Sequence, residues 1–239
     1  MGQVKVGDRI NAFGVELEGG WSVNPTRWRT HADGSLAQLS SPYQGEISSP
    51  VIPAINQVFF NEFMGISYPS EVNGSCGYHI HVSLIDPADY HALMDKKFYN
   101  HFLRFWKKWG ETTPMPENEK EIFVKRLAGT YKFSTNGRSY CERKWKAQKQ
   151  VNAHDRNMDR YCHLNFCYNI HGTIENRLLP MFSSKTLAIK ATLDYLLMIE
   201  QWLADVKRKS IVKIIYVSEL ENECTEISID AYVPEVLCV

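Results

Sequence analysis

The segment Tyr78-His-Ile-His-Val-Ser-Leu84 decides the fold class, because apolar and polar residues alternate along its whole length. A period of two is typical of a β-strand that packs one face against a core. The other face of this segment carries His79, His81 and Ser83. Two histidines at this spacing are a common strand pattern, so their meaning depends on the residues around them.

Three further segments show the same alternation, at 14–18, 162–170 and 173–179. Their polar positions are Glu16 and Glu18, then His163, Asn165 and Asn169, and finally Glu175 and Arg177. Antiparallel sheets commonly have one packed face and one polar face. We therefore expect an antiparallel sheet that collects these polar groups on one side.

Helical periodicity appears between the strands. The expected helices span 49–64, 86–109, 117–127 and 184–207. Ser49 fits the N-cap of the first helix and Pro50 its first turn. Together these patterns predict an α+β fold, with a mainly antiparallel sheet, helices on one face and the active site on the other.

The length of 239 residues suits one domain with one core, spanning residues 1–239. Strand-like stretches at 211–217 and 225–232 predict that residues 211–239 form a C-terminal, strand-forming tail. The sequence does not show what this tail does.

Composition narrows the possible partners. The formal net charge is zero, which does not favour nucleic acid as a partner. Residues 1–10 lack the apolar stretch of a signal peptide, and no apolar run is long enough to span a bilayer. Without a secretory signal, the six cysteines are expected to be reduced, in a cytoplasmic protein without a membrane partner. The oligomeric state is left open.

The glutamates on the polar face are costly to bring together. Glu16 and Glu18 are two residues apart on a strand, so their carboxylates point the same way. Two such charges about 4 Å apart repel by roughly 4 kcal/mol at an effective dielectric constant near 20. Glu46 and Glu175 would add to the repulsion unless cations lie among them. Oxygen-rich sites suit Mg²⁺ or Mn²⁺, and ATP would need the same cations.

The order of several short motifs points to a family. These motifs are Glu16-x-Glu18, Asp33-Gly-Ser35, Gly45-Glu46, Asn73-Gly-Ser-Cys-Gly-Tyr-His79-Ile-His81 and Thr173-Ile-Glu175-Asn-Arg177. In this order they resemble the amidoligase family, which belongs to the carboxylate–amine ligase superfamily with glutamine synthetase and glutamate–cysteine ligase. Arg160-Tyr161, followed by Asn165, is also similar to the amidoligase pattern. The resemblance covers roughly residues 12–180.

The resemblance implies an ATP-dependent, ADP-forming ligase that makes an amide bond through an acyl phosphate, on an amino acid or peptide carboxylate and an amine. It implies a set of ligands for two or three Mg²⁺ or Mn²⁺ ions that bind the ATP phosphates. This implied set is Glu16, Glu18, Glu46, His79 and Glu175. Arg177 would stabilise the transferring γ-phosphoryl group, His81 would contact phosphate, and Arg160 would belong to the catalytic group.

The resemblance also implies a substrate side, made of Asp33, Ser35, Asn73, Gly74 and Asn165. Two positions depart from glutamine synthetase: Cys76 is inserted in the Asn-Gly-Ser-Gly segment, and Thr173 replaces an arginine. These departures affect the expected amino-acid specificity more than the metal site.

A basic run at 125–160 offers guanidinium groups that could grip phosphate or a substrate carboxylate. The candidates are Arg126, Arg138, Arg143 and Arg160. Their spacing does not rank them.

Three other functions fit parts of the sequence. A guanidino-type phosphotransferase could have a related sheet. A zinc hydrolase could use His79, His81, His163 and a cysteine, although zinc usually takes ligands rich in nitrogen or sulfur. A non-catalytic binding protein could keep the same sheet, because each motif taken alone also fits a solvated strand face or cross-strand ion pairs.

Overall fold

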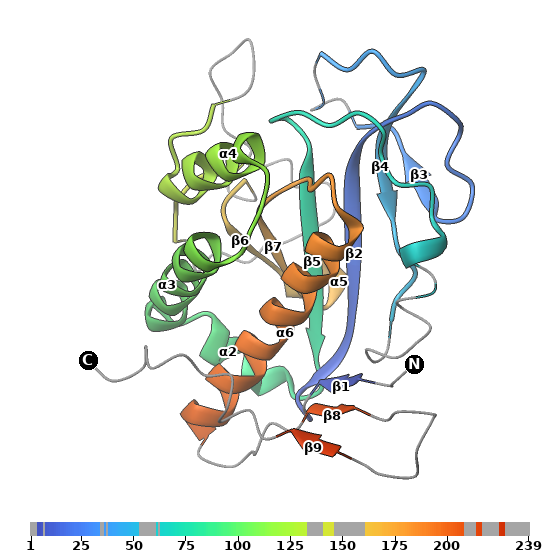
Figure 1. Cartoon of the computed structure of the whole chain (residues 1–239). Helices are drawn as coiled ribbons and strands as arrows, with labels where there is room; N and C mark the ends of the chain where they lie inside the picture. The colour runs from blue at the N-terminus through green and yellow to red at the C-terminus, as the bar shows by residue number, and fades with distance from the viewer. Residues whose placement is uncertain are drawn as a thin grey trace.

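The main sheet has six antiparallel strands (Figure 1). In spatial order they are β3 (Arg29–His31), β4 (Tyr43–Ser48), β2 (Ile10–Trp21), β5 (Gly77–Leu84), β7 (Thr173–Pro180) and β6 (Leu164–Cys167). A smaller antiparallel sheet joins β1 (Val4–Val6), β8 (Ile214–Tyr216) and β9 (Thr225–Ile227). This computed structural model describes residues 4–6, 8–33, 36, 38–52, 61, 63–132, 141–145, 161–207, 214–216 and 225–227. The expected α+β architecture with a mainly antiparallel sheet is confirmed.

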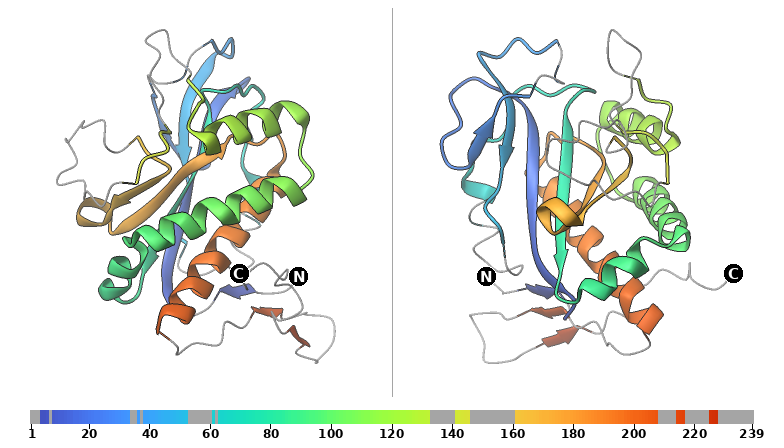
Figure 2. Two further views of the ribbon diagram at one scale, coloured as in Figure 1. Left: turned by 90° about the vertical axis from the view of Figure 1, so that its left-hand side faces the viewer. Right: turned by 180° about the vertical axis from the view of Figure 1, so that it is seen from behind.

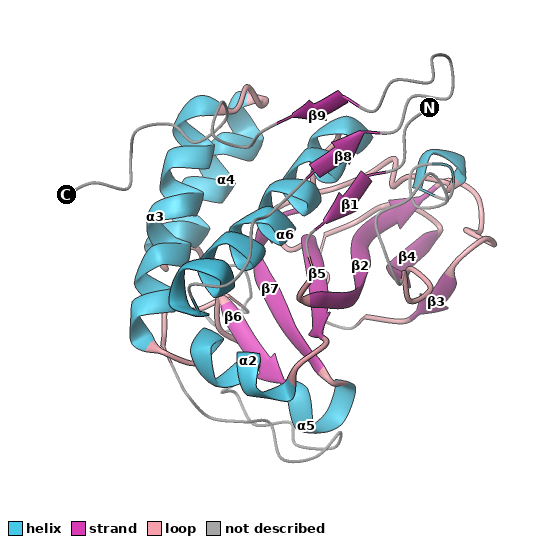
Figure 3. Ribbon diagram, turned by 90° about the horizontal axis from the view of Figure 1, so that it is seen from below, coloured by secondary structure: helices cyan, strands magenta, loops and turns pink. Residues whose placement is uncertain are grey.

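Helices cover one side of the sheet (Figure 2). They are α2 (Pro87–Leu93), α3 (Lys96–Thr112), α4 (Glu117–Ala128) and α6 (Lys185–Lys207), with a single turn, α5 (Tyr168–His171), at the end of β6. Seen from below, α6 runs across the sheet beside β5 and β7 (Figure 3). Within the described part of the chain, no helix has the length and apolarity needed to cross a membrane.

The alternation of β5 separates core from site, as the sequence predicts. Tyr78, Ile80 and Val82 are fully buried, and the Tyr78 hydroxyl lies 2.7 Å from Thr192 Oγ1 on α6. The ring of Tyr78 also contacts Phe182, with centroids 6.1 Å apart. The even-numbered residues of β5 therefore pack toward the helices, and its histidines face the other side.

The expected helix at 49–64 is wrong at its start. Ser49 is not an N-cap: its N–H donates to Val15 O at 2.9 Å, and its hydroxyl accepts from Val15 N at 2.9 Å. Ile52 pairs with Phe13 in an antiparallel bridge. Pairing with β2 thus overrides the local capping signal, and the described helical residues of this stretch are 61 and 63–65.

Two other boundaries differ from the expectation. The helix expected at 86–109 is two helices, because Asp95 caps α3 by accepting from Lys97 N at 2.8 Å. The strand expected at 162–170 ends at Cys167, where the chain turns into α5. The strands β3 and β4 were not predicted. The strands β8 and β9 fall within the stretches expected in the tail, and the remaining residues of those stretches lie outside the described residues.

Candidate metal centre

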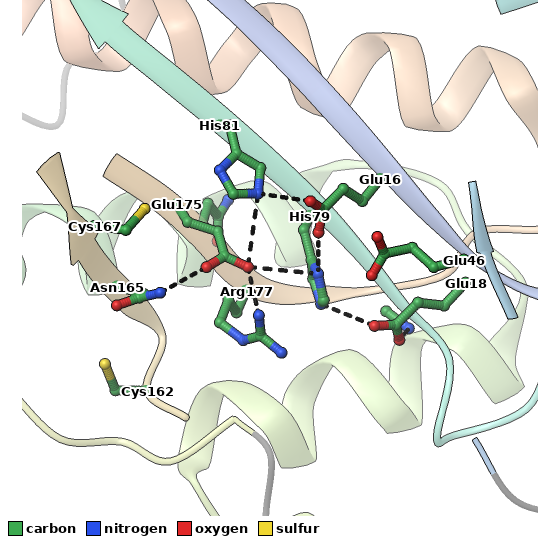
Figure 4. Close-up of polar contacts among 12 residues, drawn as sticks. Glu16, Glu18, Glu46, His79, His81, Cys162, Asn165, Cys167, Glu175 and Arg177 are labelled. Atoms are coloured by element: carbon green, nitrogen blue, oxygen red, sulfur yellow. Dashed lines mark hydrogen bonds and ion pairs between the residues drawn. The ribbon is translucent and has the colours of Figure 1, made fainter. Parts of the chain in front are cut away.

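Three neighbouring strand pairs place polar residues side by side on the open face of the sheet (Figure 4). The cross-strand pairs are Glu16 with His79, Glu18 with Glu46, and His81 with Glu175. Directly opposed residues share a face and have Cβ atoms about 5 Å apart. The register of β4, β2, β5 and β7 is therefore what assembles the cluster.

His79 lies at the centre of the cluster and is buried. Its Nδ1 is 3.1 Å from Glu16 Oε2 and 3.5 Å from Glu175 Oε1, and its Nε2 is 3.6 Å from Glu18 Oε1. Three carboxylates from two flanking strands thus converge on one imidazole.

His81 bridges the same carboxylates from a second position. Its Nε2 lies 3.1 Å from Glu16 Oε1 and 3.8 Å from Glu175 Oε1. Its Nδ1 lies 3.3 Å from Thr173 Oγ1, which in turn is 3.1 Å from Cys167 Sγ. The Thr173 contact fixes the ring so that Nε2 faces the glutamates.

Glu175 is held at both oxygens. Asn165 Nδ2 donates to Oε2 at 2.8 Å, and Arg177 Nη1 donates to Oε1 at 2.5 Å. The Arg177 guanidinium also lies over the Tyr161 ring, 5.8 Å from its centroid. Glu175 and Arg177 share the polar face, as the alternation of this segment predicts.

Gly77 is required by the close packing of the site. Its N–H donates to Glu18 Oε2 at 2.5 Å. A Cβ on this residue would lie 2.5 Å from His79 Nε2 and 3.1 Å from Glu18 Oε2. Any side chain here would push the imidazole and the carboxylate apart.

Ligand atoms of the cluster form three groups, in each of which all atoms lie within 4.8 Å of one another. The groups are Glu16, Glu46 and His79; Glu16, His81 and Glu175; and Glu18, Asp33 and Glu46. Each offers carboxylate oxygens with at most one imidazole, which is the donor set that Mg²⁺ and Mn²⁺ accept. Within the part of the chain that the structure describes, no such group contains a cysteine. The residues present therefore fit a hard divalent cation.

The protonation of the cluster reflects its crowding. Burial, together with the charges of Glu16 and Glu18, raises the pKa of Glu46 to about 7. Burial also raises the pKa of Glu18. Burial disfavours the charged forms of Glu16 and His81 as well, but their mutual attraction holds the pKa of Glu16 well below and that of His81 well above its usual range. The Glu46 carboxyl therefore resists ionisation near neutral pH, and a cation bound among these carboxylates would favour its charged form.

Arg126 is not where the sequence led us to expect it. Its side chain is buried, Nη1 donates to Leu179 O at 2.9 Å, and Nη2 donates to Gly74 O and Cys76 O, each at 3.0 Å. The expectation that Arg126 grips phosphate is wrong, because its terminal nitrogens are occupied by backbone carbonyls. Arg143 is exposed, and its Cβ lies against Gly129 at the end of α4.

His163 does not share the face of Asn165, contrary to the predicted alternation. Its ring points toward the helices, where Nε2 is 2.8 Å from Arg126 O and Nδ1 is 3.2 Å from the Tyr99 hydroxyl. The bend before β6 breaks the period of two. The zinc ligand set that included His163 is therefore not assembled.

The predicted substrate side is only partly at the cluster. Asp33, which the sequence placed with the substrate, lies with Glu18 and Glu46 as a potential metal ligand. Asn73 closes a turn next to the site, where its Oδ1 accepts from Ser75 N at 2.9 Å, and Gly74 lies beneath the Tyr131 hydroxyl. Ser35, Arg138 and Arg160 lie outside the described residues.

Sequence reasoning missed the roles of Thr173 and Gly77 and the metal-side position of Asp33. The hairpin of β3 and β4 would have placed Asp33 if it had been recognised, because that hairpin ends beside Glu46. Cys76, Cys141, Cys162 and Cys167 are buried, and no disulfide joins any two of these described cysteines. Their reduced state stays a prediction. Cys224 and Cys238 lie outside the described residues.

No family model, curated protein sequence or solved structure matches this chain.

Proposed function

We propose that this protein is an ATP-dependent, ADP-forming ligase that joins a carboxylate to an amine, with a fold related to the catalytic domain of glutamine synthetase. The observation that carries the proposal is the convergence of glutamates from β2 and β7 on His79, with Arg177 beside them and Glu46 of β4 within 4.8 Å of the same ligand atoms. A cation-binding face with an adjacent guanidinium is what phosphoryl transfer from ATP requires.

The candidate metal ligands are the three groups described above. When bound there, Mg²⁺ or Mn²⁺ would neutralise the oxygens of the ATP phosphates. Glu16, Glu46 and His79 fit one ion, and Glu18 with Asp33 and Glu46 fits another. Burial lowers the pKa of Arg177, but the carboxylates of Glu175 and Glu18 raise it by more. Arg177 therefore stays charged at any working pH. It can therefore stabilise negative charge that develops on a transferring phosphoryl group.

The proposed reaction has two steps. A substrate carboxylate oxygen attacks the γ-phosphorus of ATP, and ADP leaves. The amine nitrogen then attacks the carbonyl carbon of the acyl phosphate, inorganic phosphate leaves with the bonding electron pair, and the nitrogen loses a proton. The protein supplies position and charge rather than covalent chemistry, which suits a face built from fixed carboxylates and Arg177.

The geometry disfavours one rival. A catalytic zinc site needs three protein ligands, typically rich in histidine or cysteine. Among the described residues, each potential metal group has at most one histidine. The second histidine of β5, His81, shares its carboxylates with His79, so the cluster is dominated by oxygen ligands.

The test is ADP and phosphate release from ATP in the presence of Mg²⁺, screened against amino acids, peptides and polyamines, with mass spectrometry of the products. An amide product with both ADP and phosphate is expected. A stable phosphorylated product without phosphate release would instead identify a phosphotransferase. No nucleotide turnover with any acceptor, together with no Mn²⁺ binding, would refute the proposal.

Two variants connect the activity to the cluster. Glu175→Gln removes one ligand charge and should weaken metal-dependent ATP binding. Arg177→Ala should lower turnover more than ATP binding, because its charge acts on the transition state. Glu121→Gln, at an exposed carboxylate on α4, is the matched control for the first variant. If Arg177→Ala melts earlier than the wild type but keeps normal turnover when folded, its assignment is wrong.

A further inference from the structure

A β-bulge lies in β7 next to the candidate site. Tyr78 pairs with Leu179, and Ile80 pairs with Asn176, so one residue of β5 opposes two of β7. The single residue is His79, and the two facing it are Arg177 and Leu178. Bulges are frequent next to active sites, where they redirect side chains.

The bulge changes the face of the sheet on which the side chains of β7 lie. Residues an even number apart on a regular strand share a face. Glu175 and Leu179 are four apart, yet Glu175 pairs with His81 on the site face and Leu179 pairs with Tyr78, which packs against α6. One extra residue therefore lets β7 present Glu175 and Arg177 to the site and return Leu179 to the core.

Asn176 holds this irregularity in place. It is fully buried on the helix side, between Ile80 and Leu164 in the strand register. Its Oδ1 accepts a hydrogen bond from Leu178 N at 3.0 Å, which is an Asx-turn across the bulge. Its Nδ2 has no hydrogen-bond partner among the described residues. Burying an amide with an unpaired donor costs free energy of folding. We therefore attribute the role of Asn176 to the hydrogen bond that its Oδ1 accepts.

We propose that Asn176 is a positioning residue, whose side chain fixes the β7 bulge and thereby aims Arg177 at Glu175. The functional part of this inference rests on the proposed ligase activity, and the structural part does not. A regular strand without the Asx-turn would slip by one residue, which moves side chains to the opposite face. Arg177 follows Asn176 directly, so it is the site residue that such a slip would displace most.

Three variants separate positioning from general stability. Asn176→Leu keeps the approximate volume and removes the acceptor. Asn176→Ser keeps an acceptor that can bond the N–H two residues on, although more weakly. Thr192→Val is the matched control, because it removes a buried hydrogen bond to Tyr78 in the same core and leaves the Asx-turn of Asn176 in place.

The first measurement is amide hydrogen exchange of the peptide covering 173–182, which needs no activity. Asn176→Leu should speed exchange in this peptide, Asn176→Ser should fall between it and the wild type, and Thr192→Val should leave it unchanged. Equal exchange in Asn176→Leu and the wild type would overturn the proposal, whatever the protein catalyses.

The second measurement compares ADP release with that of Arg177→Ala. Asn176→Leu should lower turnover at least about tenfold, since small displacements of a reacting group cost that much or more. Adding Arg177→Ala to it should cost nothing further. If Arg177→Ala lowers turnover and Asn176→Leu does not, the positioning role is wrong. If Arg177→Ala itself has no effect on ADP release, the proposed function fails. The hydrogen-exchange result alone then decides whether Asn176 fixes the bulge.

Discussion

Replacing Arg126 with methionine should destabilise the protein strongly without a direct effect on nucleotide binding. Arg126 lies in the last turn of α4, and its guanidinium donates to the carbonyls of Leu179, Gly74 and Cys76. It thereby joins a helix, the end of β7 and the turn that leads into β5. Methionine keeps most of the apolar stem and removes all three donors.

The size of the effect follows from these three bonds. A hydrogen bond from a charged donor contributes about 1.5 to 3 kcal/mol, and an unsatisfied buried carbonyl costs a similar amount. Part of this is offset because the variant no longer buries a guanidinium. The net loss of unfolding free energy should be about 3 to 5 kcal/mol, which is large for one substitution.

Urea unfolding at pH 7.5 measures the loss, and titration with Mn²⁺ and ATP at low temperature measures binding. Arg143→Met is the control, because Arg143 is exposed beside Gly129 at the end of α4. That control should unfold within about 0.5 kcal/mol of the wild type. A loss below about 1 kcal/mol for Arg126→Met, combined with weaker ATP binding, would show that Arg126 acts on phosphate and that our account of it is wrong.

Three further predictions concern other parts of the described structure. Burial lowers the pKa of His163 to about 4 from its ordinary value of 6.5. As the pH falls, the unfolded chain therefore binds the proton first, and the free energy of unfolding should fall by about 2 kcal/mol between pH 7.5 and 5. His163→Gln should lose that part of the pH dependence in urea unfolding. The same pH dependence in His163→Gln and the wild type would contradict the prediction. In Gly74→Ala the new Cβ would lie 1.3 Å from the Tyr131 hydroxyl oxygen. The cost should be about 1 to 3 kcal/mol and should largely disappear when Tyr131→Ala is added, so additive losses in the double-mutant cycle would refute the contact. Asp33→Asn should weaken Mn²⁺ binding at least about tenfold, as followed by electron paramagnetic resonance, and an unchanged affinity would remove Asp33 from the ligand set.

The sequence determined the parts of the site that depend on local backbone geometry. Glu16 and Glu18 share a face, as do Glu175 and Arg177, because alternation is a property of any extended strand. His79 and His81 lie on the opposite face of β5 from Tyr78, Ile80 and Val82 for the same reason. These assignments needed no knowledge of the neighbouring strands.

Tertiary structure decided which local signals prevailed. Ser49 and Pro50 have the local pattern of a helix start, yet the hydrogen bonds of Ser49 with Val15 keep this stretch beside β2. The alternation that grouped His163 with Asn165 fails because the chain bends before β6. Local capping and strand propensities contribute less free energy than hydrogen bonding to a distant strand and packing against helices, so the tertiary contacts prevail.

Long-range packing alone decided the roles of Arg126 and Asp33. The basic run around Arg126 predicts a solvent-exposed side chain. The carbonyls to which Arg126 donates, however, belong to residues about 50 positions away in the chain. Asp33 becomes a potential metal ligand only because the hairpin of β3 and β4 brings it to Glu18. A residue's periodicity fixes the direction of its side chain, whereas its partner depends on strand order and register, which are set by the packing of the whole sheet.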